Sequence, residues 1–481
     1  MQLGFVIDQS RCIGCHACTV ACKAENNVPV GDFRTWVKYV EKGSFPAVRR
    51  HFAVFRCNHC TNAPCVAICP VNALEKRTDG VVDIDRDACI GCRACMQACP
   101  YDAIYLDEDT GAIGKCHFCA HKTEKKLAPA CVSVCPEEAI LYGDIHDPDS
   151  RVGKLARSGK TTVRRPEQNT GPNVHYIEAE PLVLQPGAAV QAPGFLWSQR
   201  APWRPEAWPS ALPVAPNALV AYEPVHKVPW GPAVAIFLVV KGTAAGAAML
   251  APFVPLKPAF GPELLVLVFT TIATALLIED LARPKLFLRL LLRPNKKSWL
   301  VRGAWVLMSF SAVEGLGFGA RLLGIPAMAD PLRWAGAVLG LAVAGYSAGL
   351  FAMCEGRDLW QSRLTLPRLL CQALSVGGAA LIGLGATSLI PEVVTALLAF
   401  LSLSAAERYL PHKTENASQA AAFLREFRVR GVPPLAAVAV AALGTVVLGL
   451  TVPAFVPALV IAAVALEEHA WLRCGQLPPN S

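Results

Sequence analysis

Sixteen of the nineteen cysteines lie in four runs of related spacing within the first 135 residues. In such a run three closely spaced thiolates bind one cubane iron–sulfur cluster, and the fourth, usually followed by proline, binds the neighbouring cluster. Four complete runs therefore predict four [4Fe-4S] clusters in two crosswise-linked pairs. The runs are Cys12-x2-Cys15-x2-Cys18-x3-Cys22, Cys57-x2-Cys60-x4-Cys65-x3-Cys69-Pro70, Cys89-x2-Cys92-x2-Cys95-x3-Cys99-Pro100 and Cys116-x2-Cys119-x11-Cys131-x3-Cys135-Pro136.

Structural zinc and disulfides are the two other uses of so many cysteines. Zinc sites use paired C-x2-C units rather than three closely spaced cysteines and a distant fourth. Disulfide frameworks suit small secreted domains, whereas 481 residues are enough for two or three domains. The spacing therefore favours iron–sulfur clusters. Cys354, Cys371 and Cys474 stand outside the runs and are expected to pack as small apolar side chains.

The composition changes along the sequence, which is 53% hydrophobic with a mean hydropathy of +0.38. Residues 1–180 are polar, charged and cysteine-rich, whereas the sequence from about Trp230 is a series of apolar stretches. Each stretch approaches the roughly 20 residues that cross a bilayer. We therefore predict a multidomain fold, with an α+β cluster domain over 1–180 and an all-α polytopic membrane domain of about eight transmembrane helices over 229–481. The stretches lie near 230–251, 262–281, 303–325, 333–353, 369–390, 393–410, 435–453 and 455–473.

Residues 181–228 are rich in proline, with Trp197, Trp203 and Trp208 interspersed. Proline at this density opposes helices and central strands. An extended strap or linker is therefore expected. It is either a disordered spacer or a segment docked along the domain or at the membrane interface, where tryptophan is enriched.

Short β-rich pieces precede several cysteine runs, for example 3–8 and 80–85. This pattern resembles that of bacterial two-cluster ferredoxins, occurring twice. The order of the runs, the widened fourth run and the stretch 143–150 resemble the iron–sulfur subunit of molybdopterin oxidoreductases. That resemblance implies four ligand sets: Cys12, Cys15, Cys18 with Cys135; Cys116, Cys119, Cys131 with Cys22; Cys57, Cys60, Cys65 with Cys99; and Cys89, Cys92, Cys95 with Cys69.

The apolar half resembles the polysulfide-reductase (NrfD-like) membrane anchors. The resemblance rests on the passage 277–299, on Trp230-Gly231-Pro232 and on Tyr346. It implies a haem-free membrane domain that exchanges electrons with a quinone. Haem anchors need histidines inside their helices, and of His226, His412 and His469 only His469 lies within an expected span. No haem is therefore expected.

Quinone chemistry moves protons with electrons, so the pocket needs titratable groups near a cluster. Tyr346 is the first candidate to donate a hydrogen bond to the quinone, with His226, Asp280 and Arg357 as further candidates. The alternative is that Asp280 and the other titratable residues near the cluster-domain face are ordinary interfacial charges.

Lys241 and Glu314 lie deeper, about 17 Å along their expected helices at 1.5 Å per residue. Intramembrane charges usually pair and often mark function. The two residues are therefore expected to form either a buried ion pair or parts of a proton path.

The distribution of basic residues predicts the orientation in the membrane. With eight spans, the loops on the cluster-domain side carry sixteen Lys and Arg, and the opposite loops carry three. The positive-inside rule then places the cluster domain in the cytoplasm and the protein in the inner (plasma) membrane as a multi-pass protein. The start, Met1-Gln2-Leu3-Gly4-Phe5-Val6, resembles neither a secretory signal nor a twin-arginine signal.

The predicted function is that of an electron-transfer and membrane-anchor subunit. Its four clusters would relay electrons between a catalytic partner and membrane quinone. A Gly-rich dinucleotide motif is absent, so substrate catalysis is expected on another subunit, by resemblance a molybdopterin protein with molybdenum or tungsten. No nucleic-acid partner is expected. The alternative is a subunit of a quinol-oxidising respiratory or ion-translocating complex with cytochrome or ferredoxin partners.

Overall fold

The computed structural model describes residues 1–191, 218–256 and 258–481. These residues form two compact units. The first comprises Met1–Pro229 together with Cys354–Arg357 and Leu477–Ser481, and the second comprises Trp230–Met353 and Asp358–Gln476. Two short segments from the C-terminal half thus fold with the cysteine-rich unit. Trp197, Trp203 and Trp208 of the expected strap lie outside the described residues.

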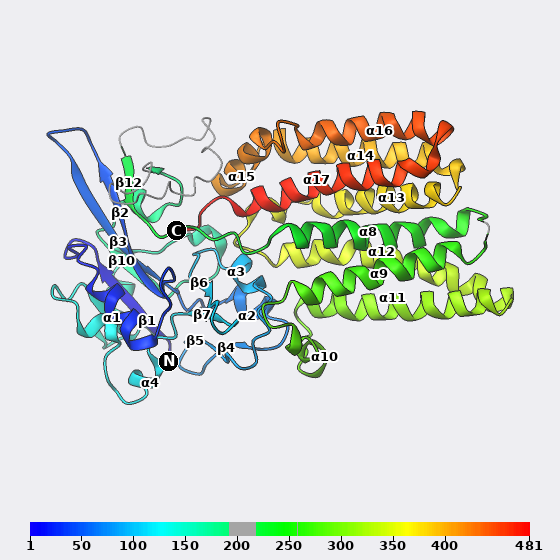
Figure 1. Ribbon diagram of the computed structural model, residues 1–481. Coiled ribbons are helices and arrows are strands. Elements are labelled where there is room, and N and C mark those ends of the chain that lie inside the picture. Colours follow the sequence, from blue (N-terminus) through cyan, green and yellow to red (C-terminus); the bar gives the residue numbers. More distant parts are fainter. Residues whose placement is uncertain (192–217, 257) are drawn as a thin grey trace. The chain divides into compact units, whose positions relative to one another are not determined.

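The first unit is built on two four-stranded sheets and two short hairpins, and Figure 1 shows the long hairpin of β2 and β3. One sheet has the order β8-β1-β10-β9 and the other β11-β12-β2-β3, while β4–β5 and β6–β7 form the hairpins. The strands are β1 Leu3–Asp8, β2 Thr35–Lys42, β3 Arg49–Arg56, β4 Leu74–Lys76, β5 Val82–Ile84, β6 Ile104–Leu106, β7 Ile113–Lys115, β8 Ile140–Asp144, β9 Thr161–Thr162, β10 Val174–Ile177, β11 Val190–Gln191 and β12 Ala218–Tyr222.

Short helices of the first unit carry the later cysteines of each run. The Cys-Pro pairs end α2 and α3, because a residue before proline is pushed out of the α region. Cys69 and Cys99 accordingly have extended ψ values of 119° and 115°. The helices are α1 Ala17–Asn26, α2 Pro64–Ile68, α3 Ala94–Ala98, α4 Ala120–Thr123, α5 Ala130–Ser133, α6 Arg151–Arg157 and α7 Pro181–Leu184.

The described flanks of the proline-rich segment belong to the first unit. Strand β12 pairs antiparallel with β2 and parallel with β11. Tyr222 faces Tyr39 across the β12–β2 pair, and both rings lie against His16 in the first cysteine loop. These flanks are therefore held by strand pairing and aromatic contacts.

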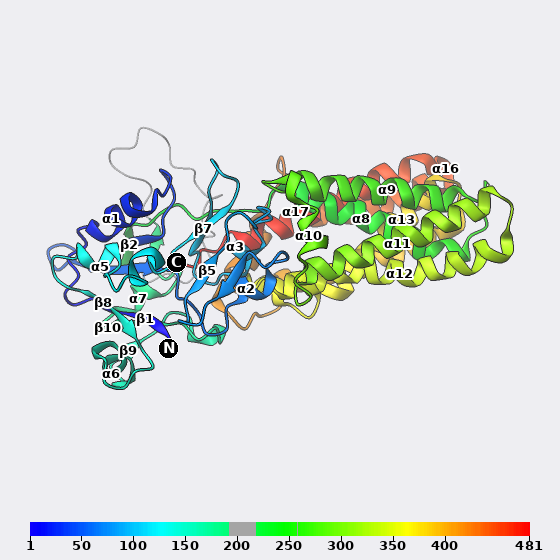
Figure 2. The same cartoon turned by 90° about the horizontal axis from the view of Figure 1, so that it is seen from below.

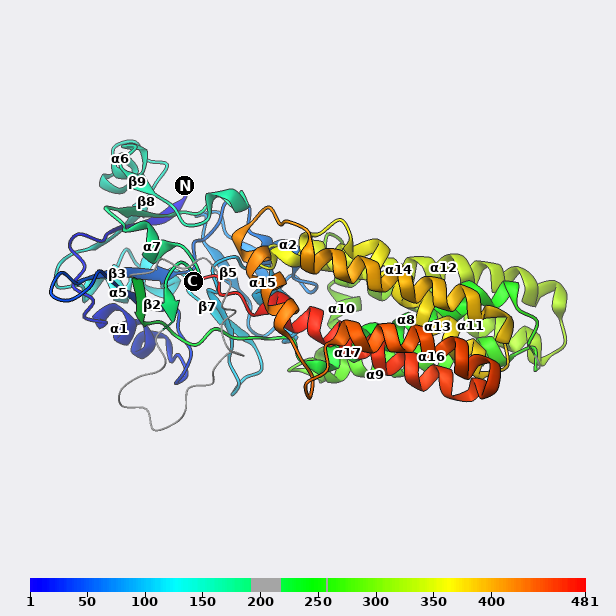
Figure 3. The same ribbon diagram turned by 90° about the horizontal axis from the view of Figure 1, so that it is seen from above.

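The second unit is a bundle of long helices, seen from two sides in Figures 2 and 3. Among the described residues, seven helices are long and apolar enough to cross a membrane. The predicted fold class is thereby confirmed. The helices of the unit are α8 Pro232–Leu250, α9 Gly261–Glu279, α10 Arg289–Leu292, α11 Trp299–Leu322, α12 Pro326–Ala352, α13 Thr365–Gly383, α14 Ile390–Tyr409, α15 Glu415–Glu426, α16 Pro434–Thr451 and α17 Val456–Gln476.

Helix α11 is not one of these seven, although it was expected to be a span. It contains Glu314 and several glycine and serine residues, which reduce its apolar character. It has 24 residues, and it packs along α9 and α12. Helix α11 therefore completes the bundle of about eight long helices that the sequence predicts.

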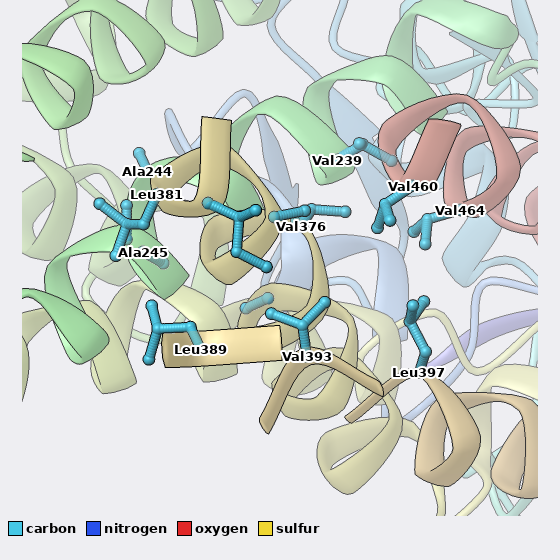
Figure 4. Packing of buried hydrophobic residues seen from close by; sticks show 14 of the residues in the cluster. Val239, Ala244, Ala245, Val376, Leu381, Leu389, Val393, Leu397, Val460 and Val464 are labelled. Carbon is cyan, nitrogen blue, oxygen red and sulfur yellow. The ribbon is translucent and has the colours of Figure 1, made fainter. Parts of the chain in front are cut away.

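The bundle core is built from small and β-branched side chains. Figure 4 shows Val376 of α13 among Val239 of α8 and Val460 and Val464 of α17, with Val393 of α14 close by. Small residues let helix backbones approach closely in a membrane. At Gly246 of α8 a Cβ atom would lie only 1.8 Å from the carbonyl oxygen of Ala373, so this contact requires glycine.

Candidate functional site

The sixteen thiols of the cysteine runs gather into four sets. Set A comprises Cys12, Cys15, Cys18 and Cys135, which line one pocket with an empty volume of about 350 Å³. Set D comprises Cys89, Cys92, Cys95 and Cys69, which line another of about 310 Å³. In both sets the fourth cysteine comes from a different run. The fold therefore places the crosswise partners in one pocket.

The other two sets are identified by the effect that their thiols have on one another's pKa. In set B (Cys116, Cys119, Cys131, Cys22), burial and then the neighbouring Cys131 and Cys119 raise the pKa of Cys22 to about 11. In set C (Cys57, Cys60, Cys65, Cys99), burial and then Cys99 and Cys57 raise the pKa of Cys65. These sets also join three cysteines of one run with the fourth of another.

The chemistry of these thiols fits iron–sulfur clusters. A metal ligand must be a thiolate, and burial opposes that charge unless a cation compensates it. Burial raises the pKa of Cys18 to about 12 and that of Cys92 to about 12. Within the described ranges, no three Cys, His, Asp or Glu side chains converge closely enough to hold a single metal ion. Four thiols in each set match the four thiolates that one [4Fe-4S] cluster takes.

The electrostatic influence of each set on the next gives the sets a linear order. Cys131 of set B lies close enough to Cys18 of set A to raise its pKa. Cys57 of set C influences Cys116 of set B in the same way, and Cys65 of set C influences Cys95 of set D. The order is A, B, C, D. Cys15 of set A is exposed, so this end of the series meets the surface of the first unit.

A further pocket of the first unit, with an empty volume of about 560 Å³, lies beside α3. Its lining combines apolar side chains with a few charged groups, as small-molecule sites do. Trp36 lines this pocket, and its indole Nε1 is buried and finds no hydrogen-bond partner among the described residues. The lining residues are Gly31, Asp32, Phe33, Trp36, Met96, Asp102, Ile104, Tyr105, Pro224, Val225, His226, Lys227, Pro229, Arg357 and Ser481.

The Asp102 carboxylate binds three polar groups at this pocket. His226 Nδ1 lies 2.8 Å from its Oδ2, and the backbone N–H of Asn480 donates to the same oxygen at 2.8 Å. Arg357 Nη2 lies 3.6 Å from Oδ1. Burial alone would raise the pKa of Asp102, but His226 and then Arg357 hold it well below its ordinary value. Asp102 is therefore an anion in the folded unit.

Arg357 reaches the pocket because its segment packs closely on α3. Arg357 Nε donates to Gln97 Oε1 at 2.8 Å, and the N–H of Gly356 donates to the Gln97 carbonyl at 3.2 Å. A Cβ at Gly356 would lie 2.5 Å from the carbonyl oxygen of Cys99, so the approach requires glycine. The pocket therefore lies beside the short helix that contains Cys95 of set D and ends before Cys99 of set C.

Of the four predicted quinone residues, the structure brings His226 and Arg357 together, through Asp102. Tyr346 and Asp280 belong to the second unit. Sequence reasoning missed Asp102 and Trp36. Asp102 follows a Cys-Pro pair by two residues, and Trp36 lies in a strand, so neither position carries a distinguishing pattern.

In the second unit, Tyr346 and Lys241 lie together. Lys241 Nζ donates to Ser347 Oγ at 2.6 Å and lies 4.4 Å from the centre of the Tyr346 ring. Glu314 instead lies against Gly336, where a Cβ would meet its Oε1 at 2.1 Å. Among the contacts of the described residues, no ion pair joins Lys241 to Glu314.

A larger group of buried charges connects α13, α14 and α17. Arg368 Nη1 lies 3.1 Å from Glu468 Oε1, and Arg368 Nε lies 3.5 Å from Glu407 Oε2. Arg408 donates from both terminal nitrogens to Glu467, at 2.7 and 2.8 Å. Sequence reasoning missed Arg368 and Arg408, although an arginine inside an apolar span is itself a signal.

Three family profiles match the protein. Residues 3–24 match a 4Fe-4S binding domain, and residues 48–145 match a 4Fe-4S dicluster domain. Residues 222–390 match the family described as polysulphide reductase, NrfD. The cysteine runs and the apolar half thus match different families.

Similar proteins are subunits of reductases. The B subunit of tetrathionate reductase from Salmonella typhimurium is 40% identical over 202 residues, covering 41% of this protein and 80% of the relative. The arsenate respiratory reductase iron-sulfur subunit ArrB from a Shewanella species is 35% identical over 229 residues, covering 37% and 97%. The thiosulfate reductase electron transfer subunit PhsB from Salmonella typhi is 41% identical over 170 residues, covering 33% and 88%.

The protein is an iron–sulfur electron-transfer protein with a multi-pass membrane domain. It belongs to the family of iron–sulfur electron-transfer subunits of reductases and carries an NrfD-type membrane anchor in the same polypeptide. The predicted fusion of these two subunit types is confirmed. So is the predicted role as an electron-transfer and membrane-anchor subunit.

Proposed function

We propose that sets A to D each hold one [4Fe-4S] cluster and relay electrons in the order A, B, C, D. When bound, each cluster supplies one-electron transfer. The cysteines hold the clusters, and the buried surroundings exclude water. The proposal is supported by the grouping of the sixteen thiols into four sets of four. It is also supported by the electrostatic influence of each set on the thiols of the next.

We propose that the pocket beside α3 binds the head group of a membrane quinone. The indole N–H of Trp36, unpartnered among the described residues, carries this proposal, because a buried donor without an acceptor is costly unless a ligand supplies one. Trp36 would donate to a quinone carbonyl oxygen. His226, oriented by Asp102, would exchange a proton with the quinone, and the Arg357 guanidinium would stabilise negative charge on the reduced oxygen.

Trp36→Phe tests the pocket, because it removes the N–H and keeps an aromatic ring. Loss of one hydrogen bond should weaken quinone binding by roughly twofold to tenfold. The measurement is the dependence of cluster reoxidation on quinone concentration. Tyr176→Phe is the matched control, since the Tyr176 hydroxyl donates to Val54 O at 3.1 Å and does not line the pocket. Equal quinone dependence in Trp36→Phe and wild type would rule out this donor.

We propose that the electron-exchange partner is a catalytic subunit with a molybdopterin cofactor, holding molybdenum or tungsten. The names of the relatives support a reductase complex. The rival is a quinol-oxidising respiratory or ion-translocating complex with cytochrome or ferredoxin partners. Purification of the native complex separates the two, because a large pterin-containing polypeptide supports the first and cytochromes support the second.

We propose that Tyr346 and Asp280 are quinone-binding residues of the membrane domain and that Lys241 and Glu314 belong to a proton path. The burial of both charges within long helices of the bundle supports this role. Glu314→Gln should keep quinone turnover and lose proton translocation in vesicles. A folded Glu314→Gln variant that retains both activities would contradict the path.

We propose that the cluster domain faces the cytoplasm, as the excess of Lys and Arg on its side of the membrane predicts. In right-side-out vesicles the exposed Cys15 region should be protected from protease. Cleavage from outside would place the domain on the other face.

A further inference from the structure

Arg56 is a buried cation among cluster thiols. It ends β3, directly before Cys57, and its side chain is 1% exposed. Its Nη1 donates to Cys131 Sγ at 3.1 Å, and its guanidinium carbon lies 4.4 Å from the centre of the Phe5 ring. Within the described part of the protein, its Nε and Nη2 have no hydrogen-bond partner. Its electrostatic neighbours are the thiols of Cys131, Cys116 and Cys18.

This environment is unusual for a structural arginine. A buried guanidinium is normally compensated by a carboxylate, because desolvation of an unpaired charge is costly. The compensating groups around Arg56 are cysteines, two from set B and one from set A. The charge is therefore matched only when these cysteines are thiolates, which is the form that binds iron.

A second arginine, Arg34, acts on the thiols of set B through Asn26. Asn26 Nδ2 lies 3.7 Å from Cys22 Sγ and 3.9 Å from Cys119 Sγ. Arg34 Nη1 in turn donates to Asn26 Oδ1 at 3.3 Å, and its Nε donates to Tyr105 OH at 3.2 Å. Side-chain donors thus reach three of the four thiols of set B. Arg56 donates to Cys131, and Asn26, which is held by Arg34, lies near Cys22 and Cys119.

We propose that Arg56, assisted by Arg34 through Asn26, raises the reduction potential of the cluster at set B. The inference rests on the proposed ligand sets. One-electron reduction adds a negative charge to the cluster and takes up no proton. A nearby fixed positive charge stabilises that reduced form, and hydrogen bonds to the sulfurs act in the same direction.

Redox titration of the full-length protein, followed by electron paramagnetic resonance with dithionite as reductant, tests the proposal. The signal of set B is first assigned with Cys119→Ser. Arg56→Gln should lower the ratio of reduced to oxidised cluster in that signal at least tenfold at the wild-type midpoint, which corresponds to about 59 mV for one electron. Arg56→Lys keeps the charge and should shift the signal less.

Arg164→Gln is the matched control. Arg164 is equally buried and stacks on Phe55 at 3.8 Å, and two of its nitrogens likewise have no partner among the described residues. Its electrostatic neighbours are Tyr176, Tyr101 and Glu223 rather than cysteines. Arg164→Gln should leave the set B potential unchanged. An equal shift in this control, or no shift in Arg56→Gln, would overturn the proposal.

Iron content distinguishes this proposal from the assignment of the clusters. A wild-type protein with fewer than four clusters contradicts the ligand sets, whereas a full complement with an unchanged Arg56→Gln potential contradicts only the role of Arg56. If Arg56→Gln does not incorporate iron, Arg34→Gln gives the second measurement. A smaller downward shift of the same signal supports the proposal, and no shift refutes it.

Discussion

Replacing Cys135 by alanine should leave the cysteines of the first run without a cluster. The other cysteines of the fourth run, to which Cys135 belongs, should keep theirs. Cys135 lies in the pocket of Cys12, Cys15 and Cys18. Loss of one thiolate should therefore expose these three thiols to alkylation, while Cys116, Cys119 and Cys131 of the fourth run stay protected by their own cluster. Electron transfer along the relay should fall to background, because set A is one end of the series.

Mass spectrometry after alkylation reads out which thiols are released. Cys371→Ala is the control, since Cys371 is a partly buried cysteine of the second unit that packs against the bundle core. It should change neither labelling nor iron content. Alkylation of the fourth run in Cys135→Ala, with the first run still protected, would refute the crosswise sets.

Asp102→Asn should destabilise the first unit by about 3 kcal/mol, the lower end of the cost of breaking a buried ion pair. The lower end applies because the Asp102 side chain is 16% exposed. The substitution leaves His226 and Arg357 without their shared anion and weakens the contact of Asn480. The measurement is the change in thermal unfolding of the cluster domain, with the exposed Asp109→Asn as control. Equal midpoints for the two variants would contradict this role.

The pH dependence of this effect has a defined sign. The pKa of Asp102 is held below its ordinary value in the folded protein. Its stabilisation is therefore complete above the ordinary carboxyl pKa of about 3.9 and is lost as the pH falls through the lower folded value. The difference in stability between wild type and Asp102→Asn should shrink as the pH falls below about 4.

The cysteine spacing predicted the iron–sulfur half well because each run is a local motif. Three ligands of each set come from one run, and in sets A, C and D they lie close together, so their spacing reflects the geometry of the cluster. The fourth ligand comes from another run. For set A this is Cys135, which lies far along the sequence from Cys18, and only the resemblance to a known family supplied that partner.

The pocket beside α3 could not be predicted in the same way. Trp36 comes from a strand, Asp102 from a turn after a Cys-Pro pair, and Arg357 from the link between two membrane helices. These positions are brought together by packing of Gly356 on α3, which has no local sequence pattern. Arg56 was missed for the same reason, since a basic residue at the end of a strand is usually exposed.

The membrane helices were predicted by their apolar lengths, with differences at their ends. Helix α13 ends at Gly383 rather than near residue 390, because Gly385 with φ 102° begins a turn before α14. Helix α12 begins at Pro326, earlier than expected, because proline is favoured in the first helical turn. Hydropathy locates a span but not the residues that start and stop it.

Reoxidation of the reduced clusters by quinone tests the central claim most directly. The full-length protein in lipid nanodiscs is reduced with dithionite, freed of excess reductant and mixed with a short-chain naphthoquinone or benzoquinone. We predict that the signals of all four clusters disappear and that His226→Ala slows this reoxidation. If ferricyanide oxidises the clusters but quinone leaves them reduced, the protein does not connect its clusters to membrane quinone.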